Sequence, residues 1–259
     1  MSVTTFDSGT SRSLQKIDIN MLSDKQIPPN ERLIFALDVG DIDEAKALVR
    51  TLDDSVLFYK LGLEIFMAGG YHDLLRWLTE QGKKTFVDLK FFDVPNTVGS
   101  AIRKLARHRP TFATVHGNDQ ILRAACDEKG DIKVLAVTVL TSLDEADLTD
   151  LGFSVDPETL VLSRAKRALA IGCDGVISSG LEAQKLRATL GENFLIVVPG
   201  IRPVRNIEED DQKRTVDVEE AFNRGADYIV VGRPIKNAAA PRDAALAIQG
   251  RIARLFRPH

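Results

Sequence analysis

The stretch that decides the fold is Thr85-Phe86-Val87-Asp88-Leu89-Lys90-Phe91-Phe92-Asp93-Val94-Pro95-Asn96-Thr97. It begins as an apolar, strand-like run and then places three charges, Asp88, Lys90 and Asp93, where the apolar pattern ends. Residues two apart in a strand share a face, so Asp88 and Lys90 are predicted to point the same way. If that face is the inside of a closed sheet, the two charges are held away from bulk water, which is costly unless both have partners. The pattern indicates either a functional pair or an ordinary ion pair at an exposed strand end.

A strand-then-helix pattern repeats on both sides of this stretch, with a period of about 25–30 residues, as expected for βα units. Most of the predicted strands are short, unbroken apolar runs, which is typical of parallel strands covered on both faces. The predicted strands are residues 33–37, 56–60, 85–89, 112–116, 133–139, 175–178, 194–198 and 228–231. The predicted helices are residues 43–52, 64–81, 96–107, 119–128, 157–171, 181–190, 218–224 and 242–255.

Eight such units predict an α/β protein with a single-domain (β/α)8 barrel over residues 31–259. Residues 1–30 are rich in Ser and Thr with scattered charges, and we expect a loosely ordered N-terminal extension there. No Ser/Gly-rich linker divides the rest of the chain. An open, doubly wound sheet is the alternative, but no G-x-G-x-x-G follows the first predicted strand.

Composition excludes several classes of protein. The 259 residues are 44% hydrophobic and 27% charged, and the net charge of −3 is unlike that of a nucleic-acid-binding surface. No apolar run approaches the roughly 18 residues of a membrane span, and residues 1–30 lack the apolar segment of a secretory signal. The four histidines are dispersed and the two cysteines lack metal-type spacing, so no metal is expected. Two distant cysteines are typical of buried thiols in a reducing, cytoplasmic setting.

A barrel places its active residues at the carboxyl ends of its strands, and charges recur there in this sequence. Asp38, Lys60, Asp88 and Lys90 follow three consecutive predicted strands and would form an alternating chain of acids and amines across one rim. Each charge alone could be a solvated strand end; four alternating ones are harder to explain in that way. Other polar strand ends are His116-Gly117, Thr138 to Ser142, Pro199 to Arg202 and Gly232-Arg233.

The loops after the seventh and eighth strands are a recurring phosphate site in barrels. Gly232 lets the backbone approach an anion, and Arg233 supplies a forked donor. The preceding loop, from Arg202 to Thr215, is long and charged and contains Gln212. Long loops of this kind are often lids, so we predict one that closes over phosphate; a surface excursion held by Pro203 is the alternative.

The stretch from Asp88 to Thr97 resembles the signature of the orotidine 5′-phosphate decarboxylase family, Asp-x-Lys-x-x-Asp followed by Ile/Val-Pro-Asn-Thr. Further segments resemble the family in the same order and span about residues 33–238. They are Ala36-Leu37-Asp38, Tyr59-Lys60-Leu61-Gly62, Val137 to Ser142, Pro199 to Pro203, Asp211 to Arg214 and Val231 to Ile235. Phe92 departs from the pattern, since many relatives have His there, and Asn118-Asp119-Gln120 replaces a Gly-rich turn.

The resemblance implies a cofactor-free lyase that removes CO₂ from C6 of orotidine 5′-phosphate in de novo pyrimidine biosynthesis, yielding uridine 5′-phosphate. It implies that Lys90 stabilises the developing carbanion and delivers the proton, while Asp88 repels the substrate carboxylate. Lys60 and Asp38 would hold this network and bind the ribose hydroxyls.

The resemblance also assigns the remaining substrate contacts. The Thr141-Ser142 turn would bind the pyrimidine edge, with Pro199 beside it. Phosphate would be held by Arg202, Gln212, Gly232 and Arg233. In the family, the residues at Asp93 and Thr97 reach into the neighbouring subunit's site, which implies a homodimer. Asp93 lies three residues past Lys90, outside the predicted strand, and need not point into its own barrel.

Three other functions stay open on the residues alone. A metal-dependent keto-sugar-phosphate decarboxylase of the same suprafamily would use the acidic residues as Mg²⁺ ligands. A Schiff-base aldolase would use Lys60 or Lys90 as its amine. A phosphosugar-binding barrel without chemistry would have little use for alternating acids and amines beside a phosphate site.

Overall fold

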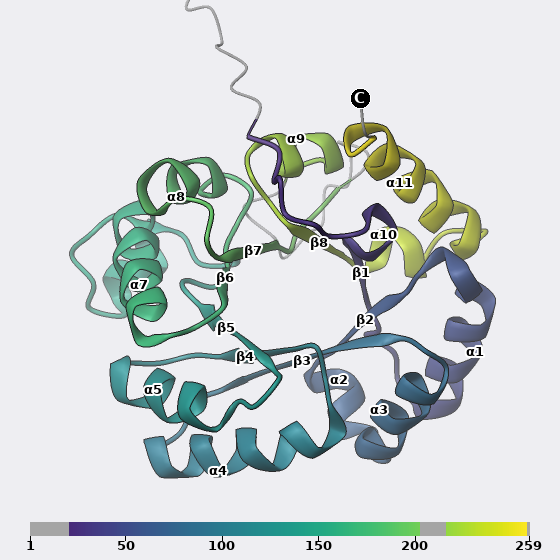
Figure 1. Ribbon diagram of the computed structural model, residues 1–259, viewed down its shortest axis with the longest axis horizontal. Coiled ribbons are helices and arrows are strands. Elements are labelled where there is room, and N and C mark those ends of the chain that lie inside the picture. The colour runs from purple at the N-terminus through teal and green to yellow at the C-terminus, as the bar shows by residue number, and fades with distance from the viewer. Residues whose placement is uncertain (1–20, 203–215, 258–259) are drawn as a thin grey trace, which may run out of the picture.

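The computed structural model describes residues 21–202 and 216–257. Eight parallel strands pair in the order of the sequence, and β8 pairs with β1 to close the barrel (Figure 1). The single-domain (β/α)8 barrel is therefore confirmed, and the open-sheet alternative is wrong. The strands are β1 Leu33–Ala36, β2 Phe58–Leu61, β3 Lys84–Phe91, β4 Phe112–Val115, β5 Lys133–Val137, β6 Gly175–Ile177, β7 Leu195–Val198 and β8 Tyr228–Val231.

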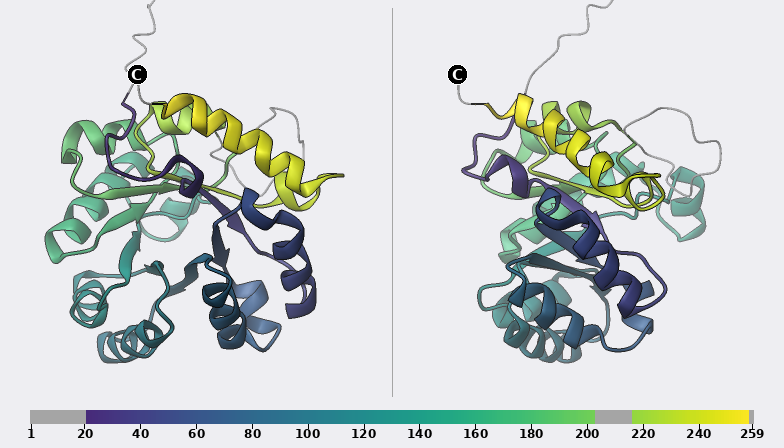
Figure 2. Two further views of the ribbon diagram at one scale, coloured as in Figure 1. Left: turned by 45° about the vertical axis from the view of Figure 1, so that its right-hand side comes forward. Right: turned by 90° about the vertical axis from the view of Figure 1, so that its right-hand side faces the viewer.

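Helices surround the strands, as Figure 1 shows, and the side views show α11 crossing the outside of the barrel beside α1 (Figure 2). The α-helices are α1 Ile42–Leu52, α2 Leu63–Met67, α3 Tyr71–Glu80, α4 Pro95–Leu105, α5 Asp119–Glu128, α6 Glu145–Asp150, α7 Pro157–Ile171, α8 Ala183–Leu190, α9 Val218–Asn223, α10 Arg233–Lys236 and α11 Pro241–Leu255. Three short 3-10 helices are η1 Pro29–Glu31, η2 Asp53–Ser55 and η3 Ala106–His108. None of the helices in the described ranges has the length and apolarity needed to cross a membrane.

The helices depart from the prediction in two ways. The helix expected over residues 64–81 is split into α2 and α3 at Gly69 and Gly70, whose φ angles of 79° and 66° are left-handed. Such angles cost glycine little and end a right-handed helix. Two short helices, α6 and α10, were not predicted. The first depends on a capping box in which Asp144 and Asp147 satisfy each other's backbone N–H groups.

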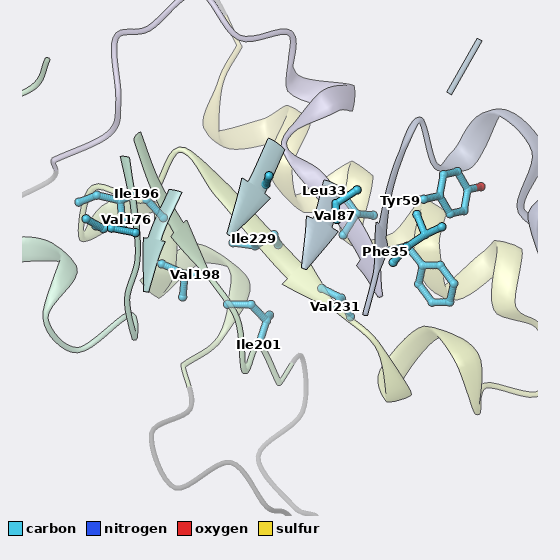
Figure 3. Close-up of a cluster of buried hydrophobic side chains, with 14 of the residues drawn as sticks. Leu33, Phe35, Tyr59, Val87, Val176, Ile196, Val198, Ile201, Ile229 and Val231 are labelled. Atoms are coloured by element: carbon cyan, nitrogen blue, oxygen red, sulfur yellow. The ribbon is translucent and has the colours of Figure 1, made fainter. Parts of the chain in front are cut away.

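The core has two layers because successive side chains of each strand point to opposite sides of the barrel wall. Leu33 and Phe35 of β1 pack outward against the helices, whereas Ile34 and Ala36 point inward. Figure 3 shows part of the outer layer, with side chains from several strands. The inner layer fills the barrel with Ile34, Ala36, Phe58, Phe86, Phe112, Leu135, Leu195, Val197, Tyr228 and Val230. These side chains fill the interior of the barrel below the rim.

Residues 21–28, part of the predicted extension, contact the barrel. The backbone N–H of Met21 donates to Asn223 O at 2.9 Å, and the hydroxyl of Ser23 donates to Asp227 Oδ1 at 2.6 Å. Leu22 packs against the outer core layer. Residues 1–20 lie outside the described ranges, and the boundary at residue 30 stays a prediction.

Candidate active site

A pocket of about 470 Å³ opens where the carboxyl ends of the strands meet. Its wall includes residues that follow β1, β2, β5, β7 and β8, together with the last residues of β3. The predicted site residues that line it are Asp38, Lys60, Asp88, Lys90, Thr141, Ser142, Pro199, Arg202, Gly232 and Arg233. Side chains up to 195 residues apart in sequence thus border one space.

Asp38, Lys60, Asp88 and Lys90 form a continuous chain of alternating charges along this pocket. Lys60 Nζ lies 3.5 Å from Asp38 Oδ1 and 3.3 Å from Asp88 Oδ2. Lys90 Nζ lies 2.9 Å from the other Asp88 oxygen, Oδ1. Both oxygens of Asp88 are therefore engaged by different ammonium groups, and the expected alternation is present in the structure.

The middle of this chain is buried and its ends are open. The side chains of Lys60 and Asp88 are 13% and 12% exposed, against 40% for Asp38 and 36% for Lys90. Burial lowers the pKa of Lys60, but the carboxylates of Asp88 and Asp38 outweigh burial and leave that pKa above its ordinary value. Burial likewise raises the pKa of Asp88, but Lys60, Lys90 and Thr114 outweigh it and leave that pKa low. Both inner groups are held in their charged forms.

Thr114 on β4 is a member of the network that the sequence did not reveal. Its hydroxyl donates to Asp88 Oδ1 at 2.9 Å and accepts from the backbone N–H of Lys90 at the same distance. The hydroxyl is fully buried and thus fixes the carboxylate and the lysine backbone together. The only signal was a polar residue in phase with the inward-facing Phe112 on the same strand.

Lys90 has an unusual backbone. Its φ of 47° is left-handed, and the register between β3 and β4 shifts between Val87 and Phe91. A non-glycine residue in this region is uncommon and strained, and bulges of this kind re-aim side chains at the rims of barrels. Here the irregularity accompanies the contact between the ammonium and Asp88.

Gly62 directly follows β2, and its lack of a side chain leaves room for the Lys60–Asp38 ion pair. A Cβ at this position would lie 3.2 Å from Lys60 Nζ and 3.3 Å from Asp38 Oδ1. Any side chain would therefore press on the ion pair between these two residues. The need for glycine here is steric, since its φ of −100° is open to any residue.

The pocket wall also carries cationic side chains outside this network. Arg202, Arg233 and Lys236 line the pocket, with Gly232 between β8 and α10. Lys236 was not predicted; its ammonium donates to the backbone carbonyl oxygen of Asp38 at 2.5 Å. Gln212, predicted to contact phosphate, lies outside the described residues, as does most of the predicted lid.

Asp93 and Thr97 do not line the pocket. Both are exposed beyond the end of β3, and Asp93 Oδ1 accepts from the N–H of Val94 at 2.6 Å. His116 also lies outside: it borders a separate pocket of about 360 Å³ and packs edge-on against Phe92, with ring centroids 5.5 Å apart. Within a single chain, Asp93 and Thr97 are thus separate from the charged network.

Known proteins resemble this chain over most of its length. The family model for the orotidine 5′-phosphate decarboxylase / HUMPS family matches residues 31–248. The chain is 60% identical over 237 residues to the orotidine 5′-phosphate decarboxylase of Methylococcus capsulatus, covering 92% of this chain and 98% of that protein. It is 51% identical over 225 residues to the protein of the same name from Xanthomonas euvesicatoria pv. vesicatoria, covering 86% and 92%.

A solved structure agrees with these sequence matches. The crystal structure of orotidine 5′-phosphate decarboxylase from Lactobacillus acidophilus superposes with a TM-score of 0.77 at 36% identity and covers 88% of this chain and 100% of that one. The barrel, its charged network and these matches lead to one conclusion: the chain belongs to the orotidine 5′-phosphate decarboxylase / HUMPS family.

Proposed function

We propose that this chain is a carboxy-lyase that converts orotidine 5′-phosphate to uridine 5′-phosphate and CO₂ in pyrimidine biosynthesis. The observation that carries the proposal is the chain Asp38–Lys60–Asp88–Lys90 in the same pocket as Arg233. The curated relatives described above are named for this activity. The family model alone also admits sugar-phosphate enzymes, so the 60% identity to a named decarboxylase carries the choice of substrate.

Lys90 has the central chemical role in this proposal. Loss of CO₂ from C6 leaves negative charge on a ring carbon, and an ammonium beside that carbon stabilises the charge as it forms. The same group then delivers the proton that completes the C6–H bond. Its 2.9 Å contact with Asp88 and its 36% exposed side chain support this role, because the amine is held in place yet open to the pocket.

Asp88 acts on the substrate carboxylate. A buried carboxylate whose pKa is lowered stays ionised, so a substrate carboxylate placed beside it is repelled in the ground state and the repulsion ends as CO₂ leaves. Thr114 and Lys60 keep Asp88 from turning away, through contacts of 2.9 and 3.3 Å. Rigid support of this kind is what ground-state repulsion requires.

Substrate positioning falls to two members of the network and to other residues of the pocket wall. Asp38 and Lys60 bind the ribose hydroxyls, and Thr141 and Ser142 meet the pyrimidine edge beside Pro199. Arg202, Gly232 and Arg233, together with Gln212 from the sequence pattern, bind phosphate. Binding energy from the phosphate, remote from C6, is available to assemble the reactive geometry.

A homodimer completes the site by supplying Asp93 and Thr97 of one protomer to the pocket of the other. Exposed apolar side chains on α2 and on the turn after β3 support such an interface: Leu63, Phe66, Met67, Phe92 and Val94 are between 40% and 79% exposed. The two segments follow the neighbouring strands β2 and β3, and Asp93 lies between Phe92 and Val94 in the second segment. Exposed apolar patches of this kind mark interaction surfaces.

The reaction proposed here needs no cofactor, and the competing chemistries fit the residues less well. A Mg²⁺ site would need free carboxylates, but both oxygens of Asp88 are engaged by lysine ammonium groups. A Schiff base needs a neutral amine, whereas the raised pKa of Lys60 keeps that amine protonated. A purely binding barrel does not explain why buried charges are assembled at the rim.

The decisive experiment follows the ultraviolet absorbance of orotidine 5′-phosphate after addition of purified protein in excess chelator. Decarboxylation at a rate set by enzyme concentration is expected, with uridine 5′-phosphate as product. Activity only after Mg²⁺ is restored, on a keto-sugar phosphate and not on orotidine 5′-phosphate, would establish the alternative. Borohydride treatment with substrate is expected to leave the protein mass unchanged, because no imine forms. A cytoplasmic location, with no nucleic-acid or membrane partner, completes the proposal.

A further inference from the structure

The two cysteines of the chain meet on the outside of the barrel. Cys126 lies on α5, and Cys173 follows α7 just before β6. Their Sγ atoms are 3.5 Å apart although 47 residues separate them in sequence. α5 and α7 lie side by side in Figure 1. The pair is near the amino ends of β5 and β6, at the opposite end of the barrel from the active-site pocket, and the proposed reaction does not use it.

Both cysteines are held on ordered backbone. Cys126 is in the last turns of a helix. Cys173 follows Gly172, the left-handed residue that ends α7, and its N–H donates to Ala168 O at 3.1 Å. Lys129 fastens the two segments together, since its ammonium donates to Gly172 O at 2.9 Å and to Asp174 Oδ2 at 2.7 Å. The two thiols are thus kept adjacent by contacts independent of either sulfur.

The two thiols differ in ways that assign them different roles. Cys126 is half-buried and Cys173 is only 6% exposed, so Cys126 is the more accessible of the two residues. The hydrogen bond from the Cys173 thiol, aided by the nearby Lys129 ammonium, lowers the pKa of Cys126. The same hydrogen bond, with burial, raises the pKa of Cys173. The more accessible thiol, whose pKa is lowered, beside a shielded thiol has the arrangement of an attacking and a resolving cysteine.

We propose that Cys126 and Cys173 form a site of reversible covalent modification, which closes to an intramolecular disulfide when a hydroperoxide oxidises Cys126. The Cys126 thiolate attacks one oxygen of hydrogen peroxide; the S–O bond of a sulfenic acid forms, the O–O bond breaks, and the other oxygen leaves as hydroxide, which takes up the proton that the Cys126 thiol released on ionising and becomes water. The Cys173 sulfur then attacks Cys126 Sγ, the S–O bond breaks, and the departing hydroxide takes up the Cys173 proton as water. In total, two thiols and one hydrogen peroxide give one disulfide and two waters.

The distance that must close is short. An S–S bond is about 2.05 Å, so the sulfurs approach by about 1.5 Å, within reach of side-chain rotation and a small backbone shift. The crosslink would join α5 to the residues between α7 and β6. A crosslink over 47 residues restricts the unfolded chain, so the oxidised protein is expected to unfold at a higher temperature.

The test treats the native full-length protein with dilute hydrogen peroxide, quenches with an alkylating agent, and maps peptides without reduction. The expected result is loss of both free thiols, a mass lower by two hydrogens, and one linked pair of peptides carrying residues 126 and 173. Dithiothreitol should restore both thiols. Cys173→Ser is the matched control and should stop at sulfenic or sulfinic acid on Cys126, whereas Cys126→Ser should leave Cys173 reduced.

Three outcomes would overturn the proposal. They are sulfinic acid on Cys126 of the wild type with Cys173 still reduced, a disulfide between two chains, and no reaction of either thiol before unfolding. Decarboxylase activity is not the readout, so failure here is distinct from failure of the proposed function. The disulfide-linked protein is expected to keep its activity, because the active-site pocket lies at the other end of the strands.

Discussion

The ammonium nitrogen of Lys236 lies 2.5 Å from the backbone carbonyl oxygen of Asp38, and this contact ties α10 to the end of β1. α10 begins at Arg233, so one four-residue helix carries both the proposed phosphate contact and the tether. Asp38 in turn is 3.5 Å from Lys60. The proposed phosphate site is thereby linked to the charged network through the Lys236 side chain.

Lys236→Met is expected to lower kcat/KM by about 10–150-fold, the effect of losing one hydrogen bond from a charged group, about 1.5–3 kcal/mol. Because Lys236 acts through Asp38, most of the loss should appear in kcat, and Lys236→Arg should recover much of it. Steady-state kinetics with orotidine 5′-phosphate check this. A rise in KM alone, with kcat intact, would show that Lys236 merely binds phosphate.

Lys90→Ala is expected to reduce kcat by at least about 10⁴-fold, because electrostatic stabilisation of the carbanion and proton delivery are lost together. The barrel should remain folded, since the side chain is 36% exposed. Circular dichroism and a single-turnover assay measure the two properties. Retained turnover in a folded variant would remove Lys90 as the proton donor.

Arg233→Ala is expected to cost about 3–5 kcal/mol of transition-state stabilisation through loss of a charge-assisted contact to phosphate. The measurement is kcat/KM, with Arg242→Ala as the control. Arg242 is a partly exposed arginine that pairs with Asp54 and does not line the pocket. Equal, small effects of the two substitutions would show that the phosphate site is elsewhere.

Mixing two variants tests whether Asp93 acts across the proposed dimer interface. Lys90→Ala and Asp93→Ala should each be inactive alone. If the site is shared, a heterodimer has one pocket that lacks both groups and one that is intact, so random mixing should restore about a quarter of wild-type activity. Refolding the two variants together provides the sample. No recovery on mixing would place Asp93 in the site of its own chain, and full activity of Asp93→Ala alone would place it outside the chemistry.

The acid stability of the protein should depend on Asp88. Its folded-state pKa is below the ordinary 3.8, so its contribution to the free energy of unfolding is present above pH 3.8 and lost as pH falls through the lower value. Lys60 has the opposite sign: its pKa is raised above 10.5, so its contribution is present below that pH and lost as pH rises through the folded value.

Urea unfolding of wild type and Asp88→Asn at several pH values measures the contribution of Asp88 to the free energy of unfolding. The variant is expected to be less stable near neutral pH, because Lys60 and Lys90 would face each other without the carboxylate, and the difference should shrink below pH 3.8. Asp43→Asn removes an exposed carboxylate as a control and should change stability by no more than about 0.5 kcal/mol. A difference between wild type and Asp88→Asn that stays constant down to acid pH would contradict the assigned shift.

The sequence predicted the barrel because its strands are buried on both faces and so appear as unbroken apolar runs. It also predicted the alternating chain, since Asp38, Lys60, Asp88 and Lys90 stand at strand ends that a closed sheet must bring together. These features depend on local pattern and one topological rule.

Other features depend on partners distant in sequence. Thr114 looks like any β-branched residue in a strand, and its role appears only when Asp88, 26 residues away, is placed beside it. Lys236 meets Asp38 across 198 residues. The left-handed backbone at Lys90 had no sequence signal, because the residue there is not a glycine. By contrast, the sequence Gly69-Gly70 did signal the end of a helix, and the prediction of one helix over residues 64–81 did not use it.

At position 90, the residue that best suits the left-handed backbone differs from the residue that supplies an amine. Glycine and asparagine adopt that conformation more readily than lysine does, so the residues that would relax the chain there are ones without an amine. If Lys90 is the proposed proton donor, selection for stability alone would tend to replace it, and selection for turnover would retain it. A library of substitutions at position 90 can be sorted separately for thermal resistance and for activity. The residues recovered by the two sorts are expected not to overlap.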